Sequence, residues 1–393
     1  MHFDLIVVGG GLAGLSLACA LRDAPLRIAL LERQPPRRPA GWPADWDARI
    51  YAISPTNRDF LDRIGVWKHL DAGRIAPIAA MEIHGGAGAR LDFSAYETGV
   101  PELGFILESS LMACELWENV KRQGNVELIC PASPQRVDMR EDAARLGLAD
   151  GRTLSARLLV AADGRDSWLR RAIGLDAFDT HYNEKGVVAN FACERPHRGI
   201  ARQWFRDDGV LAWLPLPENR ISIVWSAPDA LADELVALPA DELAHRVAAA
   251  GDHALGELTP LLPLAPAAAF PLRLMRVPQV VAPRLALIGD AAHGIHPLSG
   301  HGINLGYQDA RALAGVLADC QPWHDVGDLR LLERYQRARR EEVLLMQTAT
   351  DTLRRLFKAE LPAIGHLRRL GMNLTNALPP LKNALARYAL GTL

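Results

Sequence analysis

The chain has 393 residues, of which 49% are hydrophobic and 23% charged, and its formal net charge at pH 7 is -2. This length and composition are typical of a globular protein with two or three domains, and they exclude disordered and fibrous classes. The near-neutral charge, without a basic tract, argues against nucleic-acid binding. The five scattered cysteines contain no CxxC pair, so we expect neither a disulfide framework nor a metal site.

Two uncharged stretches have the apolar character of a targeting or membrane segment. Residues 5–21 contain a small-residue Ala-Cys-Ala run, but Asp4 precedes them in place of a basic residue, and three consecutive glycines interrupt the run. Residues 258–272 are too short to span a bilayer and contain four prolines. We therefore expect a cytoplasmic protein without a transmembrane helix.

The chain opens with a predicted βαβ unit, in which residues 5–8 and 27–31 are strands and residues 12–21 form a helix. Gly9, Gly11 and Gly14 form a Gly-x-Gly-x-x-Gly turn between the first strand and the helix. Gly9 permits the tight turn, Gly11 lets the backbone approach a pyrophosphate, and Gly14 lets the helix pack closely. Glu32 ends the second strand, where a carboxylate accepts hydrogen bonds from an adenosine ribose. The pattern predicts a dinucleotide site for FAD or NAD.

Two later segments resemble the first. Residues 156–164 and 284–290 each read as a buried strand that ends in a glycine-bearing turn before a helix. Because parallel strands present ligand sites at their carboxyl ends, we expect all three turns to meet at one bound molecule. The Asp163-Gly164 pair, taken alone, is also compatible with an ordinary turn.

The third segment continues into a glycine- and histidine-rich loop. Asp290 follows the strand, where its carboxylate can bind a polyol hydroxyl, and a helix is predicted to start near Gly302. The amides at a helix N-terminus suit an anion such as the pyrimidine end of a reduced flavin. The predicted backbone contacts come from Ser299, Gly300, His301, Gly302 and Ile303, with Pro297 stiffening the loop. His296 and His301 are equally well read as ordinary loop imidazoles.

Between these segments, residues 187–226 alternate and are rich in aromatic and β-branched residues, which predicts an antiparallel sheet. Five aromatic side chains there are candidates for the wall of an apolar substrate pocket, although plain core is the more common role for each: Phe191, Trp204, Phe205, Trp213 and Trp225. After residue 331 the pattern is helical, and the segment from Leu353 is basic. It predicts either a membrane or partner contact, or a helix packed on the flavin domain.

Three motifs together resemble the FAD-dependent aromatic hydroxylases of the p-hydroxybenzoate hydroxylase type: VVGGGLAG, VAADGRDSWLR and LIGDAAHGIHPLSGHGINLG. DARIYAISP, DRIGVW and WLPLP narrow the resemblance to the ubiquinone-biosynthesis hydroxylases. This family implies an α/β fold with a Rossmann-like FAD-binding domain, an interleaved antiparallel-sheet substrate domain and a C-terminal helical segment. We expect residues 1–75, 106–178 and 276–330 in the first, 76–105 and 179–275 in the second, and 331–393 in the third.

The resemblance also implies the site residues. The catalytic positions at the flavin face would be His296, Pro297 and Gly300. The cofactor-binding set would be Gly9, Gly11, Leu12, Ala13, Gly14, Glu32, Arg33, Arg49, Asp163, Gly164, Asp290, Pro297, Gly300, Gly302, Ile303 and Asn304. The candidates for a base that deprotonates the phenol are Tyr51, Tyr182, His84 and His296.

The implied reaction is hydroxylation of a prenylated phenol in ubiquinone biosynthesis through a flavin C(4a)-hydroperoxide, with NAD(P)H as a transient electron donor and molecular oxygen as co-substrate. Three alternatives remain: a hydroxylase of another small aromatic or apolar substrate, a flavin-binding assembly partner without turnover, and an NAD-dependent dehydrogenase. An NAD-dependent dehydrogenase would use the first glycine turn, but it would not explain the GDAAHGIHP motif.

Overall fold

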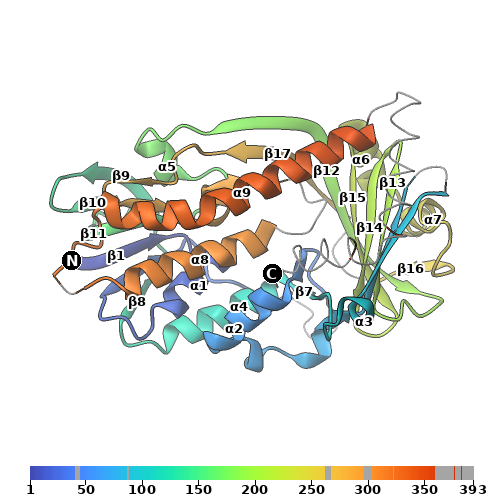
Figure 1. The fold of residues 1–393 in the computed structure, drawn as a ribbon, viewed down its shortest axis with the longest axis horizontal. Helices are drawn as coiled ribbons and strands as arrows, with labels where there is room; N and C mark the ends of the chain where they lie inside the picture. Colours follow the sequence, from blue (N-terminus) through green and yellow to red (C-terminus); the bar gives the residue numbers. More distant parts are fainter. Residues whose placement is uncertain are drawn as a thin grey trace.

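The computed structural model describes residues 1–39, 45–85, 88–261, 267–295, 302–321 and 323–358, together with Asn376 and Lys382. Two large sheets lie side by side, a small third sheet joins them, and a long helix runs along both (Figure 1).

The first sheet is built around parallel strands in the order β19-β11-β1-β2-β8. Its strands are β1 (His2–Val8), β2 (Ile28–Leu31), β8 (Val126–Ile129), β9 (Pro134–Met139), β10 (Ala144–Leu148), β11 (Thr153–Ala161), β18 (Val281–Ala282) and β19 (Leu285–Leu287). Along β1, Leu5 and Val7 pack against helices on one face, while Ile6 and Val8 join the core on the other. Burial on both faces explains why these strands read as continuous apolar runs. The four strands predicted at residues 5–8, 27–31, 156–164 and 284–290 are confirmed as β1, β2, β11 and β19.

Helices cover this sheet. They are α1 (Leu12–Ala20), α2 (Pro55–Arg63), α4 (Ser109–Lys121), α5 (Trp168–Ala172) and α8 (Gly302–Ala318), with short 3₁₀ turns η1 (Trp67–His69), η2 (Ala72–Arg74) and η4 (Gly289–Ala291). α1, α4 and α8 share one hydrophobic core with β1. The predicted helix start near Gly302 is confirmed.

The second sheet has nine strands and is mostly antiparallel, as predicted. Its strands are β5 (Ala80–His84), β6 (Arg90–Ser94), β12 (Phe178–Cys193), β13 (Ile200–Arg206), β14 (Gly209–Leu216), β15 (Arg220–Pro228), β16 (Leu258–Pro260), β17 (Ala268–Arg276) and β20 (His293–Gly294). α6 (Asp229–Ala237) and α7 (Ala240–Ala250) cover one face, and α3 (Ala95–Thr98) follows β6.

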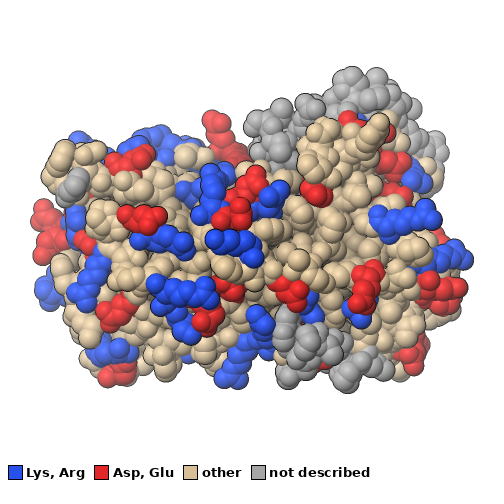
Figure 2. All heavy atoms as spheres, turned by 90° about the horizontal axis from the view of Figure 1, so that it is seen from below, with Lys and Arg blue, Asp and Glu red and all other residues tan. Residues whose placement is uncertain are grey.

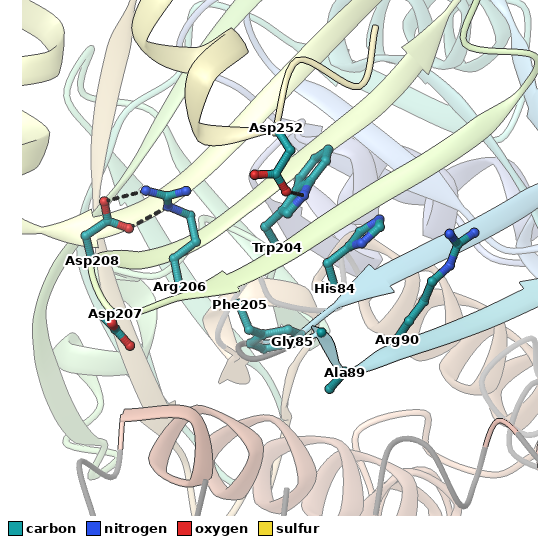
Figure 3. Close-up of a pocket in the computed structure, with 11 residues that line it drawn as sticks. His84, Gly85, Ala89, Arg90, Trp204, Phe205, Arg206, Asp207, Asp208 and Asp252 are labelled. Carbon is teal, nitrogen blue, oxygen red and sulfur yellow. Dashed lines mark hydrogen bonds and ion pairs between the residues drawn. The ribbon is translucent and has the colours of Figure 1, made fainter. Parts of the chain in front are cut away.

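The aromatic residues of this sheet correct one expectation. Four of the five proposed pocket-wall residues, Phe191, Trp204, Trp213 and Trp225, are buried in the core that the sheet forms with α6 and α7. The substrate-wall interpretation is therefore wrong for these four, and the plain-core alternative holds. Phe205 follows Trp204 along β13 and points to the opposite face of the sheet (Figure 3).

The small third sheet has the order β3-β7-β4, with β3 (Ile50–Ile53), β4 (Ala76–Ile78) and β7 (Gly104–Glu108). Ile78 and Ile106 pack with Ala201 and Leu216 of the second sheet. Because Ala201 follows the side-chain alternation of Phe205, this contact lies on the face away from α6 and α7.

α9 (Leu329–Lys358) runs along both large sheets (Figure 1). Its Tyr335 hydroxyl donates to the Leu287 carbonyl of β19 at 2.8 Å, and its Gln347 amide donates to the Met275 carbonyl of β17 at 2.8 Å. The predicted C-terminal helix is thus present through Lys358. Among the described helices, none has both the length and the apolar character needed to cross a bilayer.

Candidate functional site

Three turns that are far apart in the sequence meet at one edge of the first sheet. β11 lies between β1 and β19, with Ala161 opposite both Val8 and Leu287. A Cβ atom added to Gly9 would stand 2.3 Å from the Ala162 carbonyl oxygen, and one added to Gly289 would stand 3.1 Å from the Ala13 Cβ. The predicted convergence of the three turns is confirmed.

The first turn has the geometry of a phosphate cradle. Gly9 has φ +111°, a region that L side chains rarely adopt, and a Cβ on Gly14 would stand 2.1 Å from the Gly9 carbonyl oxygen. At Gly11, by contrast, no described atom lies within 4 Å of an added Cβ. Among the described residues, no side chain caps α1 at its Gly11 end. Open space and the amides of the first helical turn, including that of Leu12, which have no partner within the helix, fit the pyrophosphate of a dinucleotide.

Glu32 stands beside this turn. Its Oε2 accepts a hydrogen bond from the Gly10 amide at 2.6 Å, and its Oε1 accepts from the amides of Arg33 and Gln34 at 2.7 and 3.2 Å. A carboxylate offers about four acceptor positions, so capacity for a ribose hydroxyl remains. The Arg33 side chain is exposed.

The second turn is internally braced. The Asp163 carboxylate accepts hydrogen bonds from the Ser167 hydroxyl and, at 3.1 Å, from the Leu169 amide. The Asp163 carboxylate oxygens, which the resemblance assigned to cofactor binding, therefore hold the start of α5. Gly164 has φ +83°, and no described atom lies within 4 Å of its added Cβ.

The third turn presents an exposed carboxylate near β3. Gly289 has φ +59° and Asp290, which follows it, is exposed. Burial raises the pKa of Tyr51, the Arg49 charge lowers it, and the charge of Asp290 raises it further, leaving the pKa above its ordinary value. Tyr51 thus lies close to both charged groups. At neutral pH it keeps its proton and can donate a hydrogen bond, which disfavours it as the base.

Arg49 lies between the first and second sheets. Its guanidinium carbon is 5.4 Å from the centre of the Phe270 ring on β17. Two residues earlier, the Asp47 carbonyl accepts a hydrogen bond from the Asn190 amide of β12 at 3.2 Å. The segment leading to Arg49 therefore crosses the face of the second sheet that α6 and α7 leave uncovered.

The start of α8 is fastened to β3 and α2. The buried Asn304 donates from Nδ2 to the Ala52 carbonyl at 2.7 Å, and its Oδ1 accepts from the Ser54 amide and from Asn57 Nδ2, both at 2.9 Å. This side chain positions the helix N-terminus that begins with Gly302 and Ile303. The catalytic candidates His296, Pro297 and Gly300, like Ser299 and His301, lie outside the described residues.

Two of the proposed bases lie elsewhere. Burial raises the pKa of Tyr182 to about 12, and its hydroxyl lies 3.3 Å from Asp351 of α9. His84 stacks on Trp204 at 5.2 Å, in a hollow of about 640 Å³ (Figure 3). Trp204 belongs to the core beneath α6 and α7, so His84 lies on the wrong face of the second sheet to meet Arg49.

The sequence did not indicate a buried ionic cluster behind the third turn, formed by His293, Asp309 and Arg339. The sequence pattern of α8 gives no sign of this cluster, because Asp309 looks like any other polar residue of an amphipathic helix. Across the described ranges, no group of three or more His, Cys, Asp or Glu side chains is placed to hold a metal ion.

Comparisons with known proteins agree with this geometry. The FAD binding domain family model matches residues 2–349. The ubiquinone hydroxylase UbiL of Rhodospirillum rubrum is 36% identical, over 99% of this chain and 90% of its own. The 3-demethoxyubiquinol 3-hydroxylase of Escherichia coli is 33% identical, over 99% and 98%.

Among solved structures, the fold is similar to that of PqsL, a probable FAD-dependent monooxygenase from Pseudomonas aeruginosa. The TM-score is 0.78 at 22% identity, covering 95% of this chain and 100% of that one. The cradle at Gly11, the carboxylates of Glu32 and Asp290, and these likenesses lead to one assignment. The chain belongs to the FAD-binding family of aromatic-ring monooxygenases that includes the ubiquinone-biosynthesis hydroxylases, and FAD is its cofactor.

Proposed function

We propose that the protein hydroxylates the aromatic ring of a prenylated phenol in ubiquinone biosynthesis, with NAD(P)H as electron donor and molecular oxygen as co-substrate. The observation that carries the proposal is the meeting of the three turns at one sheet edge, with open space beyond Gly11 in the first turn and the exposed Asp290 in the third. The names of the two relatives supply the substrate class.

Each part of the proposed site has a physical task. The amides from Gly11 to Ala13 would bind the pyrophosphate, Glu32 the adenosine ribose, and Asp290 the ribityl hydroxyls. The amides of Gly302 and Ile303 would face the pyrimidine end of the ring system, where the dipole of α8 stabilises negative charge. Bound FAD would supply the redox chemistry and the activation of oxygen, while the protein orients the ring and excludes water.

The proposed substrate wall is the face of the second sheet opposite α6 and α7. Val188, Val224 and Ala212 lie directly across from one another on β12, β15 and β14. Their neighbours Val187, Trp225 and Trp213 are in the core on the other face, so this row faces the side on which Arg49 lies. The row is apolar and lacks large side chains, which suits a prenylated ring.

We also propose that the chain divides at the domain boundaries expected from its sequence. The strands of the first sheet come from residues 2–31, 126–161 and 281–287, and most strands of the second come from 80–94 and 178–276. β20 crosses this division, since it pairs with β17. That pairing links the third turn directly to the substrate sheet.

The finer proposal concerns α9 and the membrane. Leucines are exposed along its outer side: Leu344, Leu345, Leu353 and Leu356. Arg355 is exposed beside them, whereas Arg354 faces inward and pairs with Glu184 at 3.1 Å. We propose that this side contacts an anionic membrane surface, from which a prenylated substrate would be drawn. On the face shown in Figure 2, by contrast, basic and acidic groups alternate.

One experiment tests the reaction. The chain would be expressed in cells lacking individual quinone-pathway hydroxylases, and the intermediate that disappears would be identified by mass spectrometry. Oxygen uptake by the purified yellow protein should depend on that intermediate. Flavin binding without such uptake would favour the assembly-partner alternative, and uptake with unrelated small aromatics alone would favour a different hydroxylase.

A further inference from the structure

The turn that carries Asp290, residues 289–293, packs closely against α1 and α8. Gly289 packs so closely that a Cβ there would meet the Ala13 Cβ of α1 at 3.1 Å and the Gly306 Cα of α8 at 3.9 Å. An added Cβ on Gly306 would be in ordinary van der Waals contact with Ala13 and Gly289, both at 3.5 Å. The turn therefore has little room to shift unless the helices around it shift too.

One carboxylate holds both ends of this turn. Asp309 of α8 is fully buried, and its Oδ2 accepts hydrogen bonds from the Gly289 amide at 2.9 Å and from His293 Nε2 at 2.6 Å. Asp290 lies between these two anchor points and is itself exposed. Fixing residues 289 and 293 to the same side chain fixes the direction in which Asp290 projects.

The second oxygen of Asp309 connects the turn to α9. Oδ1 accepts a hydrogen bond from Arg339 Nε at 2.8 Å, and Arg339 also donates to Gln308 at 3.1 Å and pairs with Glu342. The Arg339 side chain is 6% exposed. A buried carboxylate that accepts hydrogen bonds from an arginine, a histidine and a backbone amide stays ionised and rigid, because each partner satisfies one of its lone pairs.

We propose that Asp309 is a positioning residue for FAD. By holding Gly289 and His293, it orients the Asp290 carboxylate toward the ribityl chain. Through Arg339, it makes this orientation depend on the packing of α9. The inference rests on the proposed contact between Asp290 and FAD. Asp309 itself contacts only protein.

A double-mutant cycle on the full-length holoprotein tests this, with the rate of FAD release followed by flavin fluorescence. Asp290→Ala removes a charge-assisted hydrogen bond and should speed release about tenfold. Asp309→Asn should speed release to a similar degree. The combined variant should release FAD little faster than Asp290→Ala alone. Once the Asp290 carboxylate is removed, the loss of its orientation has no further effect.

Two further variants keep the test decisive if Asp309→Asn folds poorly. His293→Leu removes one anchor of the turn and should speed FAD release, whereas His293→Gln retains a donor and should restore most of the wild-type rate. Glu184→Gln is the matched control, since it breaks another carboxylate–guanidinium pair of α9, with Arg354, far from the turn. It should lower the unfolding midpoint without changing FAD release.

The release rates distinguish a failure of the positioning role of Asp309 from a failure of the contact between Asp290 and FAD. If Asp290→Ala speeds release but the effects of Asp309→Asn and Asp290→Ala multiply to about a hundredfold, the positioning role is overturned while the site stands. If His293→Leu leaves the release rate unchanged, the role is likewise overturned. If Asp290→Ala itself has no effect, the contact between Asp290 and FAD is wrong, and the inference falls with it.

Discussion

Arg74 and Glu108 form a buried two-point ion pair beneath the segment that leads to Arg49. Arg74 Nε lies 2.6 Å from one carboxylate oxygen and Nη2 lies 2.8 Å from the other, with side chains 6% and 0% exposed. Glu108 also accepts from the Asp47 amide at 2.6 Å, and Arg74 donates to the Asp45 carbonyl at 2.7 Å. Through these two backbone contacts, the ion pair holds residues 45–49 in place.

Glu108→Gln should therefore lower both stability and turnover. It leaves the Arg74 guanidinium buried without an anionic partner, which costs about 3 kcal/mol in the free energy of unfolding. Because the segment carrying Arg49 loses its anchor, kcat/KM should fall about tenfold or more. Urea unfolding and steady-state oxygen uptake measure the two effects.

The control is Asp138→Asn, which breaks the exposed pair with Arg140, whose side chains are 45% and 47% exposed. It should change the free energy of unfolding by less than about 0.5 kcal/mol. Equal losses in the two variants would show that the buried pair has no special role.

The glycines of the first turn should separate FAD binding from folding. Gly11 is the N-cap of α1, with φ -75° and open space beyond an added Cβ, so Gly11→Ala should fold and lose at most about 1 kcal/mol of stability. It should weaken FAD binding about tenfold or more, because the methyl group occupies the pyrophosphate space. Gly14→Ala instead drives a Cβ into the Gly9 carbonyl and should cost about 2 kcal/mol of stability. Thermal unfolding and FAD titration would show whether the two effects divide in this way.

Stability should depend on pH through His293. Burial lowers the pKa of His293, but the charge and hydrogen bond of Asp309 raise it, and despite opposing Arg339 the pKa lies above its ordinary value. A raised histidine pKa stabilises the fold below about pH 6.5, and this contribution disappears as pH rises through the folded-state pKa. Burial raises the pKa of Asp309, whereas His293 and Arg339 lower it to below its ordinary value, so its contribution is lost only at acid pH.

The measurable consequence is a pH-dependent difference between wild type and His293→Gln. The stability gap should be largest between about pH 4 and 6.5 and should narrow at higher pH. Asp309, Arg339 and Asp290 are the charged groups acting on His293 and are unchanged in the variant. A gap independent of pH from 5 to 9 would mean that His293 does not titrate in this range in the folded protein.

Membrane contact through α9 is tested by its exposed leucines. Leu345→Glu with Leu353→Glu should abolish flotation with anionic lipid vesicles, since each leucine buried in the interface contributes roughly 1.5–3 kcal/mol. Tyr96→Glu on α3 is the control, because Tyr96 is 92% exposed but belongs to another surface. Unchanged flotation of the double variant would leave α9 as a packed helix without a membrane role.

The amino-acid sequence is enough to predict four strands of the first sheet, the glycine turns that follow three of them and their order along the chain. Each of these features is encoded by contiguous residues: a buried apolar run, then glycine at a position with positive φ, then a helix, as at Val8, Gly9 and Leu12. The convergence of three such turns also followed, because parallel strands all end at one edge of their sheet.

Which face of each element meets which neighbour depends on how distant segments pack, and the sequence pattern does not give it. Alternation along β13 shows that Trp204 and Phe205 lie on opposite faces, but it cannot say which face α7 covers. The ion pairs of Arg74 with Glu108 and of Asp309 with Arg339 were equally hidden, since their partners lie tens of residues apart and become neighbours only when the sheets and helices pack. Charged residues at such positions look like solvated surface until burial forces them to pair.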